Sequence, residues 1–450
     1  MANILVAGAG HGGVTAAILL AQAGHSVTIL EQSASGETGY PQNDAFDMDC
    51  FEYAGIPLPD YFPLGKNKLT LVPLDPNTQS LTLPCSDMDS VIIDRQVLIG
   101  YLLDLAEKAG ARIIYNCMVI SPIMLGSRVA GVTTNTGDYY ADLVIDACGL
   151  NSPLRNGLPD FTYVNRKVQM YDTVYTYRAY FKKLKNSEQP ETDFNVHLKE
   201  DGREGFYWVV NEADAVDVLI LKFTPLDRAK VLSKLHEIYY ENPHISKDFI
   251  KCGRYAQIPV CQPLGMLIAD GYAAVGDSAF MTYAIKGSGI AYSIRAGKIL
   301  ADTVLSDING MFNCETLWDY QKRFFKEIGF SACRIALVKN TALQFTAEEI
   351  SNLLKSGIIT TEELAAFLNN TLDIFTDAAG RALLKSKIKQ LRENAPLKKK
   401  ISDLAVAIGK FAVTETYLPS RYDRKDAIKW VERYNEFFNS VKNITDISGV

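Results

Sequence analysis

The chain of 450 residues lacks the features that would assign it to several special classes. Its eight cysteines stand singly, with no CxxC pair and no zinc-ligand spacing, so neither a metal centre nor a disulfide framework is predicted. There is no long basic block and the formal net charge is -6, which argues against nucleic acid as the principal partner. No apolar run reaches the roughly 18 residues of a spanning helix, and the N-terminal run has no basic flank. A reducing cytoplasm is therefore the expected setting, without a membrane span or a signal peptide.

What the sequence does have is a glycine-rich turn near its start. NILVA (3–7) predicts a strand, residues 14–23 predict a helix of small side chains, and 26–30 predict a second strand that ends at Glu31. The turn between the first strand and the helix carries a GxGxxG pattern, and its glycines are Gly8, Gly10, Gly12 and Gly13. This order of strand, glycine turn, helix, strand and acid is typical of a dinucleotide site.

Each residue of this motif has a physical reason to be there. Gly8 permits the tight turn, Gly10 lets the backbone approach a pyrophosphate, and Gly13 lets the helix pack closely on the strand. The helix N-terminus offers unpaired N–H groups to phosphate oxygens. Glu31 is placed to accept hydrogen bonds from ribose hydroxyls, and its charge disfavours a 2′-phosphate. His11 lies inside the turn, and a solvent-facing ring is slightly favoured over a phosphate contact.

Further segments along the chain predict an α/β protein with a separate sheet. Residues 33–60 are polar and predict a long irregular loop. A helix is expected over 92–110, with Asp94 as its N-cap. Aromatic and β-branched runs at 174–181, 205–210 and 216–223 predict an antiparallel sheet, and helical patterns dominate after residue 315.

Four separated segments together resemble the FAD-dependent oxidoreductases of the p-hydroxybenzoate hydroxylase-like fold. They are the glycine turn with Glu31, the Asp94-Arg95 pair that leads a helix, DLVIDACGLNSPLR (142–155), and VGDSAFMTYAIKGSGIAYSIRAG (275–297). The resemblance implies FAD as the cofactor, with Arg95 on its phosphates and Asp277 of a Gly-Asp motif on its ribitol and pyrophosphate. It also implies that the glycine loop at 286–289 approaches the flavin edge. The implied cofactor-binding residues are Gly8, Gly10, Gly12, Gly13, Glu31, Arg95, Gly276, Asp277, Gly287, Gly289 and Ile290.

Within that fold, the chain is most similar to the geranylgeranyl reductase-like branch, through PQNDAFDMDCFEYAGI (41–56) and GFYWVV (205–210). This resemblance implies reduction of carbon–carbon double bonds in a hydrophobic, isoprenoid-type lipid by hydride transfer from reduced flavin. The chain departs from the branch at two places: Gln42 and Asn43 stand where a cysteine often follows the proline, and Ala284 and Ser288 replace a proline and a glutamate. These departures leave open the substrate and the electron donor, either NAD(P)H or a ferredoxin-type carrier.

Two other functions remain open at the level of sequence. One is a flavin-dependent aromatic monooxygenase on the same fold, which would use NAD(P)H and oxygen. The other is a catalytically silent protein that binds FAD or carries lipid. No catalytic residue is identified, but an alkene needs an apolar slot, and the candidates for its lining are Tyr175, Tyr207 and Trp208. Lys286 is a further pocket candidate, which would either place positive charge near the reduced flavin or point outward into solvent. Strand alternation predicts that about half of the sheet aromatics face a ligand.

The resemblance also implies a division into domains. Residues 1–160 and 250–330 would form a discontinuous Rossmann-like FAD-binding domain, 161–249 an inserted antiparallel β-sheet substrate domain, and 331–450 a helical C-terminal region. The stretch LKKKISDLAVAIGKFAV (397–413) combines three lysines with an apolar face. A solvated charge run beside a core helix is the favoured interpretation, and peripheral contact with anionic lipid is the second. The sequence carries no signal for an oligomeric state.

Overall fold

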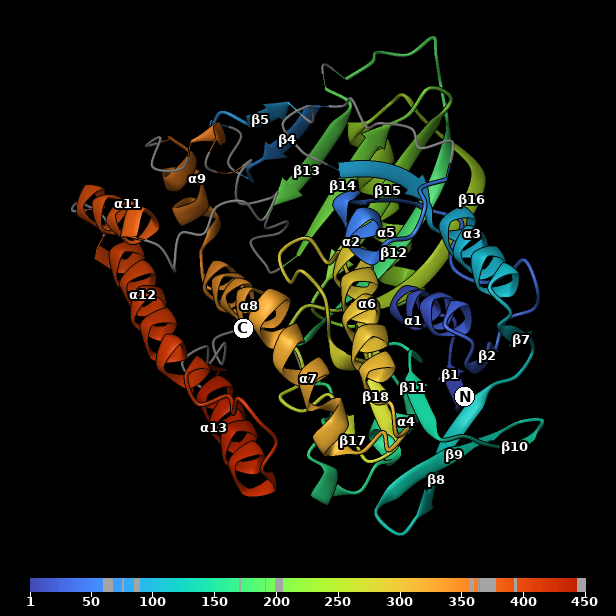
Figure 1. Cartoon of the computed structure of the whole chain (residues 1–450). Helices are drawn as coiled ribbons and strands as arrows, with labels where there is room; N and C mark the ends of the chain where they lie inside the picture. The colour runs from blue at the N-terminus through green and yellow to red at the C-terminus, as the bar shows by residue number, and fades with distance from the viewer. Residues whose placement is uncertain are drawn as a thin grey trace.

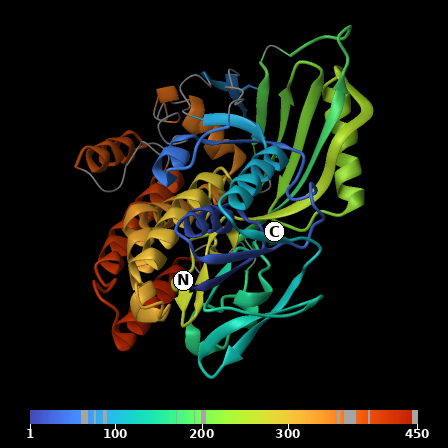
Figure 2. The same ribbon diagram turned by 45° about the vertical axis from the view of Figure 1, so that its right-hand side comes forward.

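The computed structural model describes residues 1–59, 68–74, 77–84, 90–169, 171–190, 192–198, 205–355, 360–362, 364, 378–391 and 395–442. Two large sheets organise this part of the chain. Figures 1 and 2 show the seven-stranded sheet above the six-stranded one, with the C-terminal helices on the left in both views. Among the described helices none is both long and apolar enough to cross a membrane.

The six-stranded sheet has the order β17-β18-β11-β1-β2-β7 and is parallel from β18 to β7. Its central strands are almost completely buried and read as continuous apolar runs, as a sheet covered on both faces requires. Its strands are β1 (Asn3–Ala7), β2 (Ser26–Leu30), β7 (Arg112–Ile114), β11 (Leu143–Asp146), β17 (Ile268–Ala269) and β18 (Tyr272–Ala274).

Helices cover this sheet and pack on one another at close range. A Cβ atom at Gly297 of α6 would lie 2.3 Å from the carbonyl oxygen of Gly12 in α1, so the two helices can approach only because this glycine has no side chain. The helices nearest the sheet are α1 (His11–Gln22), α2 (Asp49–Ala54), α3 (Arg95–Lys108), α4 (Pro153–Gly157), α6 (Ile290–Ser306) and α7 (Cys314–Phe324). Short 3-10 helices lie at Asp160–Thr162 and Gly276–Ala279.

The seven-stranded sheet has the order β16-β12-β15-β14-β13-β4-β5, and its pairs are antiparallel except for β13 with β4. Helix α5 (Arg228–Glu241) packs on one face through Val231, Leu235 and Ile238. The strands are β4 (Lys68–Val72), β5 (Leu81–Pro84), β12 (Thr173–Lys183), β13 (Phe194–Leu198), β14 (Gly205–Asn211), β15 (Ala215–Lys222) and β16 (Ile245–Pro259). Strands β4 and β5 thus join the sheet from a part of the chain well before residue 161.

Two smaller sheets complete the β structure. Strands β8 (Val119–Leu125), β9 (Arg128–Thr134) and β10 (Gly137–Tyr140) form a three-stranded antiparallel sheet. Strands β3 (Asn43–Asp47) and β6 (Ser90–Asp94) pair with each other. The expectation of an irregular loop over 33–60 is therefore wrong in part, because β3 and α2 lie within it. The sequence did not predict β3 because its polar side chains, which make its contacts in the site, interrupt the apolar alternation that is typical of a strand.

The C-terminal region is helical where it is described. A π-helical turn (Phe325–Gly329) joins α7 to α8 (Phe330–Leu343), and α9 (Ala347–Lys355), α11 (Ala378–Gln390), α12 (Ala395–Glu415) and α13 (Arg424–Lys442) follow. Aromatic rings of α13 pack against Phe325 and Phe411, which ties these helices to the main core. The helix expected at EELAAFL (362–368) lies largely outside the described residues.

Candidate functional site

A cavity of about 1550 Å³ lies between the two large sheets. Sites for one small ligand usually occupy roughly 300–1,000 Å³, so this cavity has room for a large ligand and a second molecule beside it. One end is formed by the glycine turn, Glu31, Arg95 and Asp277, and is polar. The other end lies on the face of the seven-stranded sheet and is formed by apolar side chains from β4, β13, β14 and β15.

The glycine turn forms a backbone cradle at the polar end. Gly8 has a φ of +85°, and a Cβ atom there would lie 2.6 Å from the Ala147 carbonyl oxygen. At Gly10 the same oxygen would be 2.9 Å away, and at Gly13 a Cβ atom would lie 2.5 Å from the Ala147 side chain. Helix α1 begins at His11, and no side chain caps its first N–H groups. These N–H groups are suited to bind phosphate oxygens.

The helix begins earlier than the sequence predicts, so Gly12 and Gly13 belong to its first turn. Gly8, Gly10 and Gly12 line the cavity, whereas Gly13 is not among the described lining residues and instead packs against Val6 and Ala147. The role expected for Gly13, close packing of helix on strand, is consistent with this position.

Glu31 lies in the cavity wall at the end of β2 and is only 7% exposed. Its Oε2 atom accepts a hydrogen bond from Ala9 N–H at 2.9 Å, and its Oε1 atom accepts one from Ser33 N–H at 2.8 Å. The carboxylate therefore fixes the glycine turn to the second strand. Each oxygen keeps a lone pair for another donor, such as a sugar hydroxyl.

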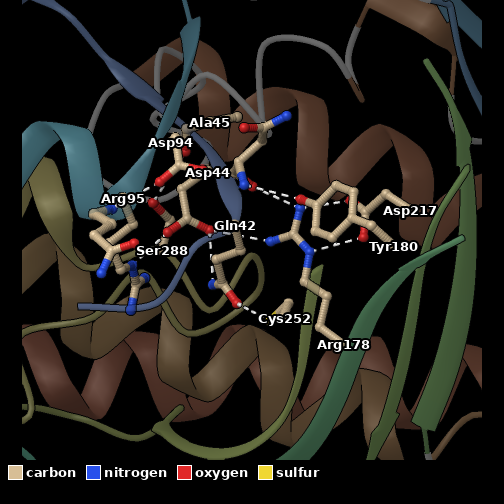
Figure 3. Close-up of polar contacts among 12 residues, drawn as sticks. Gln42, Asp44, Ala45, Asp94, Arg95, Arg178, Tyr180, Asp217, Cys252 and Ser288 are labelled. Carbon is tan, nitrogen blue, oxygen red and sulfur yellow. Dashed lines mark hydrogen bonds and ion pairs between the residues drawn. The ribbon is translucent and has the colours of Figure 1, made fainter. Parts of the chain in front are cut away.

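Arg95 is held at one side of its guanidinium only. Its Nε atom donates to Asp44 Oδ2 at 2.5 Å, as Figure 3 shows. Among the described residues, none pairs with its Nη1 or Nη2 atoms, and the side chain lines the cavity. A guanidinium fixed in this way presents a two-pronged donor to an anion.

Asp44 links Arg95 to a second arginine, Arg178 of β12. Arg178 donates to Asp217 of β15 through Nε at 2.9 Å and Nη2 at 2.6 Å, to Asp44 Oδ1 at 3.2 Å, and to the carbonyl oxygen of Asn43 at 2.6 Å (Figure 3). Burial by itself would raise the pKa of Asp44, but the two arginine charges outweigh it and hold the pKa below its usual value. Asp44 is thus an ionised bridge between the start of α3 and the seven-stranded sheet.

The contacts around this bridge continue into β3 and β14. Tyr180 accepts a hydrogen bond from Asn43 N–H at 2.9 Å, and the Asn43 side chain donates to Glu212 at 2.6 Å. The Arg178 guanidinium lies 5.0 Å from the centre of the Trp208 ring. Arg178, Asp44, Asp217 and Glu212 all line the cavity, and the sequence did not single out any of them. Arg178 interrupts the largely apolar strand β12, and Asp217 interrupts the largely apolar strand β15. These isolated charges were the signal that could have identified both residues.

The Gly-Asp motif lies on the same wall as Arg95. Asp277 follows β18, and the Thr282 hydroxyl donates to its carboxylate at 3.4 Å. Burial raises the pKa of Asp277, although the Arg95 charge and Thr282 oppose this effect. Gly276 has a φ of +72°, and a Cβ atom at Gly289 would lie 3.2 Å from Asp277 Oδ1. Gly276, Gly287, Gly289 and Ile290 line the cavity together with Asp277.

The aromatic candidates divide between the two faces of the sheet. Trp208, Phe206 and Tyr175 line the cavity, and so does Lys286. Tyr207 departs from its expected position. It is not among the described lining residues, because strand alternation points its side chain to the opposite face of the sheet. There it donates to Glu241 of α5 at 2.9 Å and stacks on His197 with ring centres 4.2 Å apart.

His11 also departs from its expected position. Its ring lines the cavity instead of facing solvent, and its Nε2 atom is buried with no hydrogen-bond partner among the described residues. Burial and then the nearby Arg95 charge lower the pKa of His11 to about 3, so the ring is neutral near pH 7. An orphaned ring nitrogen at the phosphate-binding end indicates that a ligand completes this site.

The residues at the polar end fit a dinucleotide such as FAD. The glycine cradle, the open Nη atoms of Arg95, the Glu31 carboxylate and the unpartnered His11 nitrogen supply groups for phosphates and sugar hydroxyls. The cavity is polar at one end and apolar at the other, and a ring system would fit where the two halves meet. No group of histidine, cysteine and acidic residues suited to a metal ion occurs in the described ranges.

Comparisons with known proteins agree with this fit. The family model described as FAD dependent oxidoreductase matches residues 74–303. The chain is 22% identical over 379 residues to a digeranylgeranylglycerophospholipid reductase of Sulfolobus acidocaldarius, which covers 80% of this chain and 82% of that protein. A protein of the same name from Methanosphaerula palustris is 27% identical over 320 residues, 68% of this chain and 77% of that protein.

A solved structure has the same fold. It is a geranylgeranyl bacteriochlorophyll reductase-like protein from Thermoplasma acidophilum, with a TM-score of 0.69 and 19% identity, and the match covers 90% of this chain and 99% of that one. This likeness supports an α/β fold with a Rossmann-like FAD-binding unit, a second sheet and C-terminal helices.

Proposed function

Because the chain belongs to the FAD-dependent oxidoreductases, we propose that its reaction is the reduction of carbon–carbon double bonds in a hydrophobic, isoprenoid-type substrate. The observation that carries the proposal is the apolar half of the cavity, which lies next to the dinucleotide cradle. The names of the relatives support it, since both reductases described above are named for a lipid with geranylgeranyl chains.

The polar residues would hold the cofactor. The N–H groups at the start of α1 and the Nη atoms of Arg95 bind its phosphates, Glu31 accepts from the adenosine ribose, and Asp277 accepts from the ribitol chain. Gly276, Gly287 and Gly289 have no side chains, so the ring system would lie against backbone at these positions, and Ile290 would contribute apolar surface to the same wall. When bound, FAD supplies the hydride that an isolated double bond requires.

The apolar residues would hold the substrate. Leu69, Leu71, Phe194, Phe206 and Trp208 present aliphatic and aromatic surface to the cavity, together with Leu219 and Leu221 of β15. Such a wall excludes water and binds a hydrocarbon chain without demanding polar groups from it. The indole Nε1–H of Trp208 is buried without a partner among the described residues, and an oxygen atom of a lipid headgroup would accept a hydrogen bond from it.

Stopped-flow oxidation of the reduced holoprotein separates this reaction from oxygen insertion. Under anaerobic conditions an unsaturated isoprenoid lipid is expected to reoxidise the flavin and to emerge saturated. Trp208→Leu should slow this step, whereas Tyr207→Phe, on the other face of the same strand, should not. A flavin that reacts rapidly with oxygen, transfers an oxygen atom to an aromatic compound and ignores the lipid would contradict the proposal.

Peripheral contact with membranes is the second part of the proposal. Lys398, Lys399 and Lys410 of α12 are exposed, and so are Val406 and Val413 of the same helix. A helix that presents lysines beside apolar side chains suits an anionic lipid surface. Sedimentation with anionic vesicles should fall when Lys398 and Lys399 are both changed to Glu, and unchanged binding would contradict this part.

A further inference from the structure

A tight loop between the Gly-Asp motif and α6 carries a lysine that the proposed cofactor and substrate contacts do not use. Tyr283 N–H donates to the Ser288 carbonyl oxygen at 2.8 Å, and Gly287 N–H donates to the Tyr283 carbonyl oxygen at 2.9 Å. Gly287 has a φ of +66°, which allows the chain to reverse at this point. These bonds fix Lys286 at the tip of the loop.

The loop lies where the two halves of the cavity meet. On one side, Ile285 belongs to the same apolar cluster as Phe206, Trp208 and Leu219 of the sheet. On the other side lies Gly289, where a Cβ atom would be 3.2 Å from Asp277 Oδ1. Lys286 follows Ile285 directly and itself lines the cavity, so its side chain stands between the apolar half and the cradle.

A second, small cavity of about 30 Å³ adjoins the first at this loop. Ala45, Lys286 and Ser288 line both cavities. The small cavity is further lined by Phe46, Asp47, Tyr283, Ala291 and Tyr292. This volume is enough for a water molecule, and the side chains around it include polar ones that could hold it. Lys286 therefore forms part of the wall of both the small cavity and the ligand cavity.

The electrostatic surroundings make this amine a better acid than an ordinary lysine. Burial lowers the pKa of Lys286, and the Asp47 charge opposes the effect. The titratable groups that face it are Asp47 at the end of β3, Tyr283 in its own loop and Tyr292 in α6. A proton donor works best when its pKa lies near the working pH, so the direction of this shift favours proton transfer from the ammonium.

We propose that Lys286 gives the proton that completes reduction of the double bond, and that the small cavity reloads it with a proton from water. This inference rests on the proposed function. The double bond accepts a hydride on one carbon from the reduced flavin, and the other carbon takes a proton from Lys286 Nζ. The π bond is lost, two C–H bonds form and the flavin is oxidised. The neutral amine then regains a proton from water in the small cavity beside Asp47.

Other acids in the cavity wall are occupied by stronger contacts. Glu31 accepts two backbone N–H groups, and Asp44 and Asp217 are paired with Arg178. Asp277 and Glu212 are the exceptions, because burial raises the pKa of both carboxyls. Asp277, which accepts from the Thr282 hydroxyl, is assigned to the cofactor, whereas only the Asn43 amide among the described residues donates to the Glu212 side chain. Glu212 is therefore the competing donor against which Lys286 has to be tested.

The test compares Lys286→Met, Lys286→Arg and Glu212→Gln in anaerobic single turnover of the reduced holoprotein with an unsaturated isoprenoid lipid. Both Lys286 variants should retain FAD but form saturated lipid roughly 100-fold more slowly, since general acids contribute at least about that factor. Arginine keeps the charge but cannot release a proton, so it should fail like methionine. Lys298→Met, which removes an α6 lysine paired with Asp302, is the matched control and should react normally.

A measurement without turnover accompanies this one. Competitive acetylation followed by peptide mass spectrometry gives the apparent pKa of each lysine, and Lys286 should titrate below the usual range of a lysine. Normal turnover by Lys286→Arg would overturn the proposal and leave a purely electrostatic role, and loss of turnover in Glu212→Gln alone would transfer the role to Glu212. Wild-type protein that saturates no lipid would contradict the proposed function, whereas an unshifted Lys286 pKa would contradict only this inference.

Discussion

At the scale of single residues, the site depends on small groups placed where nothing larger fits. The glycines of the first turn were predictable because their spacing is a chemical requirement of the phosphate cradle. His11 was not predictable in the same way, since a ring in a glycine turn can face either side. Its position follows from the start of α1, which lies earlier than the apolar pattern indicates.

Gly10→Val should abolish FAD binding. A Cβ atom at this position would lie 2.9 Å from the Ala147 carbonyl oxygen and would push the turn away from the strand. The purified variant should lack the visible flavin absorption band. Gly100→Ala in α3 is a matched control, because a Cβ atom there meets nothing within 4 Å. A normal flavin spectrum in Gly10→Val would show that the cradle is elsewhere.

His11 should make the FAD-free protein less stable as the pH falls. An unfolded imidazole binds its proton near pH 6.5, whereas folded His11 has a pKa of about 3 because of burial and the Arg95 charge. Below about pH 6.5 the unfolded chain thus binds more protons, and at pH 5 this difference costs up to about 2 kcal/mol. Urea unfolding should therefore show a larger loss between pH 7 and pH 5 in wild type than in His11→Gln. Exposed His236→Gln should behave like wild type.

At the scale of elements, the strands and helices with a simple period were predictable and those with mixed character were not. The sequence located β1, β2 and β12 closely, and Asp94 does cap α3 by accepting from Gln96 N–H. It did not locate β3, β13 or β16. Strand β16 is 15 residues long but lies at the sheet edge and exposes both charged and apolar side chains, so it does not show the regular alternation that marks a strand. The Asp44 bridge was missed because Asp44 lies in β3, one of the strands that the sequence did not locate.

Removal of Arg178 should loosen the contact of β3 with β12 and leave Asp217 of β15 without its cation. Its side chain is 7% exposed and that of Asp217 is 3% exposed, so Arg178→Met would leave a buried carboxylate without its cation. Such a change costs about 3–5 kcal/mol. Urea unfolding should show that loss, and an Arg178→Met/Asp217→Leu double variant should recover much of it. Lys185→Met, in an exposed pair with Asp214, should leave the unfolding midpoint unchanged. A small effect of Arg178→Met would mean that water replaces the pair.

At the scale of the whole molecule, two sheets enclose one cavity that neither would form alone. The domain limits proposed from sequence, 1–160 with 250–330, 161–249 and 331–450, remain a proposal, and the seven-stranded sheet takes β4 and β5 from the first of these ranges. Long-range pairing of this kind leaves little trace in a single sequence, because a short strand does not indicate which partner it will meet.

Cofactor binding should stabilise the entire molecule. A ligand that binds only the folded state at 100 times its Kd adds about 2.7 kcal/mol. FAD returned to stripped protein should therefore raise the Tm clearly. FMN, which lacks the adenosine half and cannot reach Glu31, should raise it less. Equal shifts with FAD and FMN, measured by differential scanning calorimetry, would remove Glu31 and the glycine cradle from the binding site.

The most direct test of the account is the stoichiometry of one anaerobic turnover. Fully reduced holoprotein is mixed with a geranylgeranyl lipid, and the flavin spectrum and the mass of the lipid are followed together. The account predicts that each flavin oxidised saturates one double bond, with one hydrogen from the flavin and one from solvent. Flavin that stays reduced beside an unchanged lipid, and is oxidised only when air enters, would contradict it.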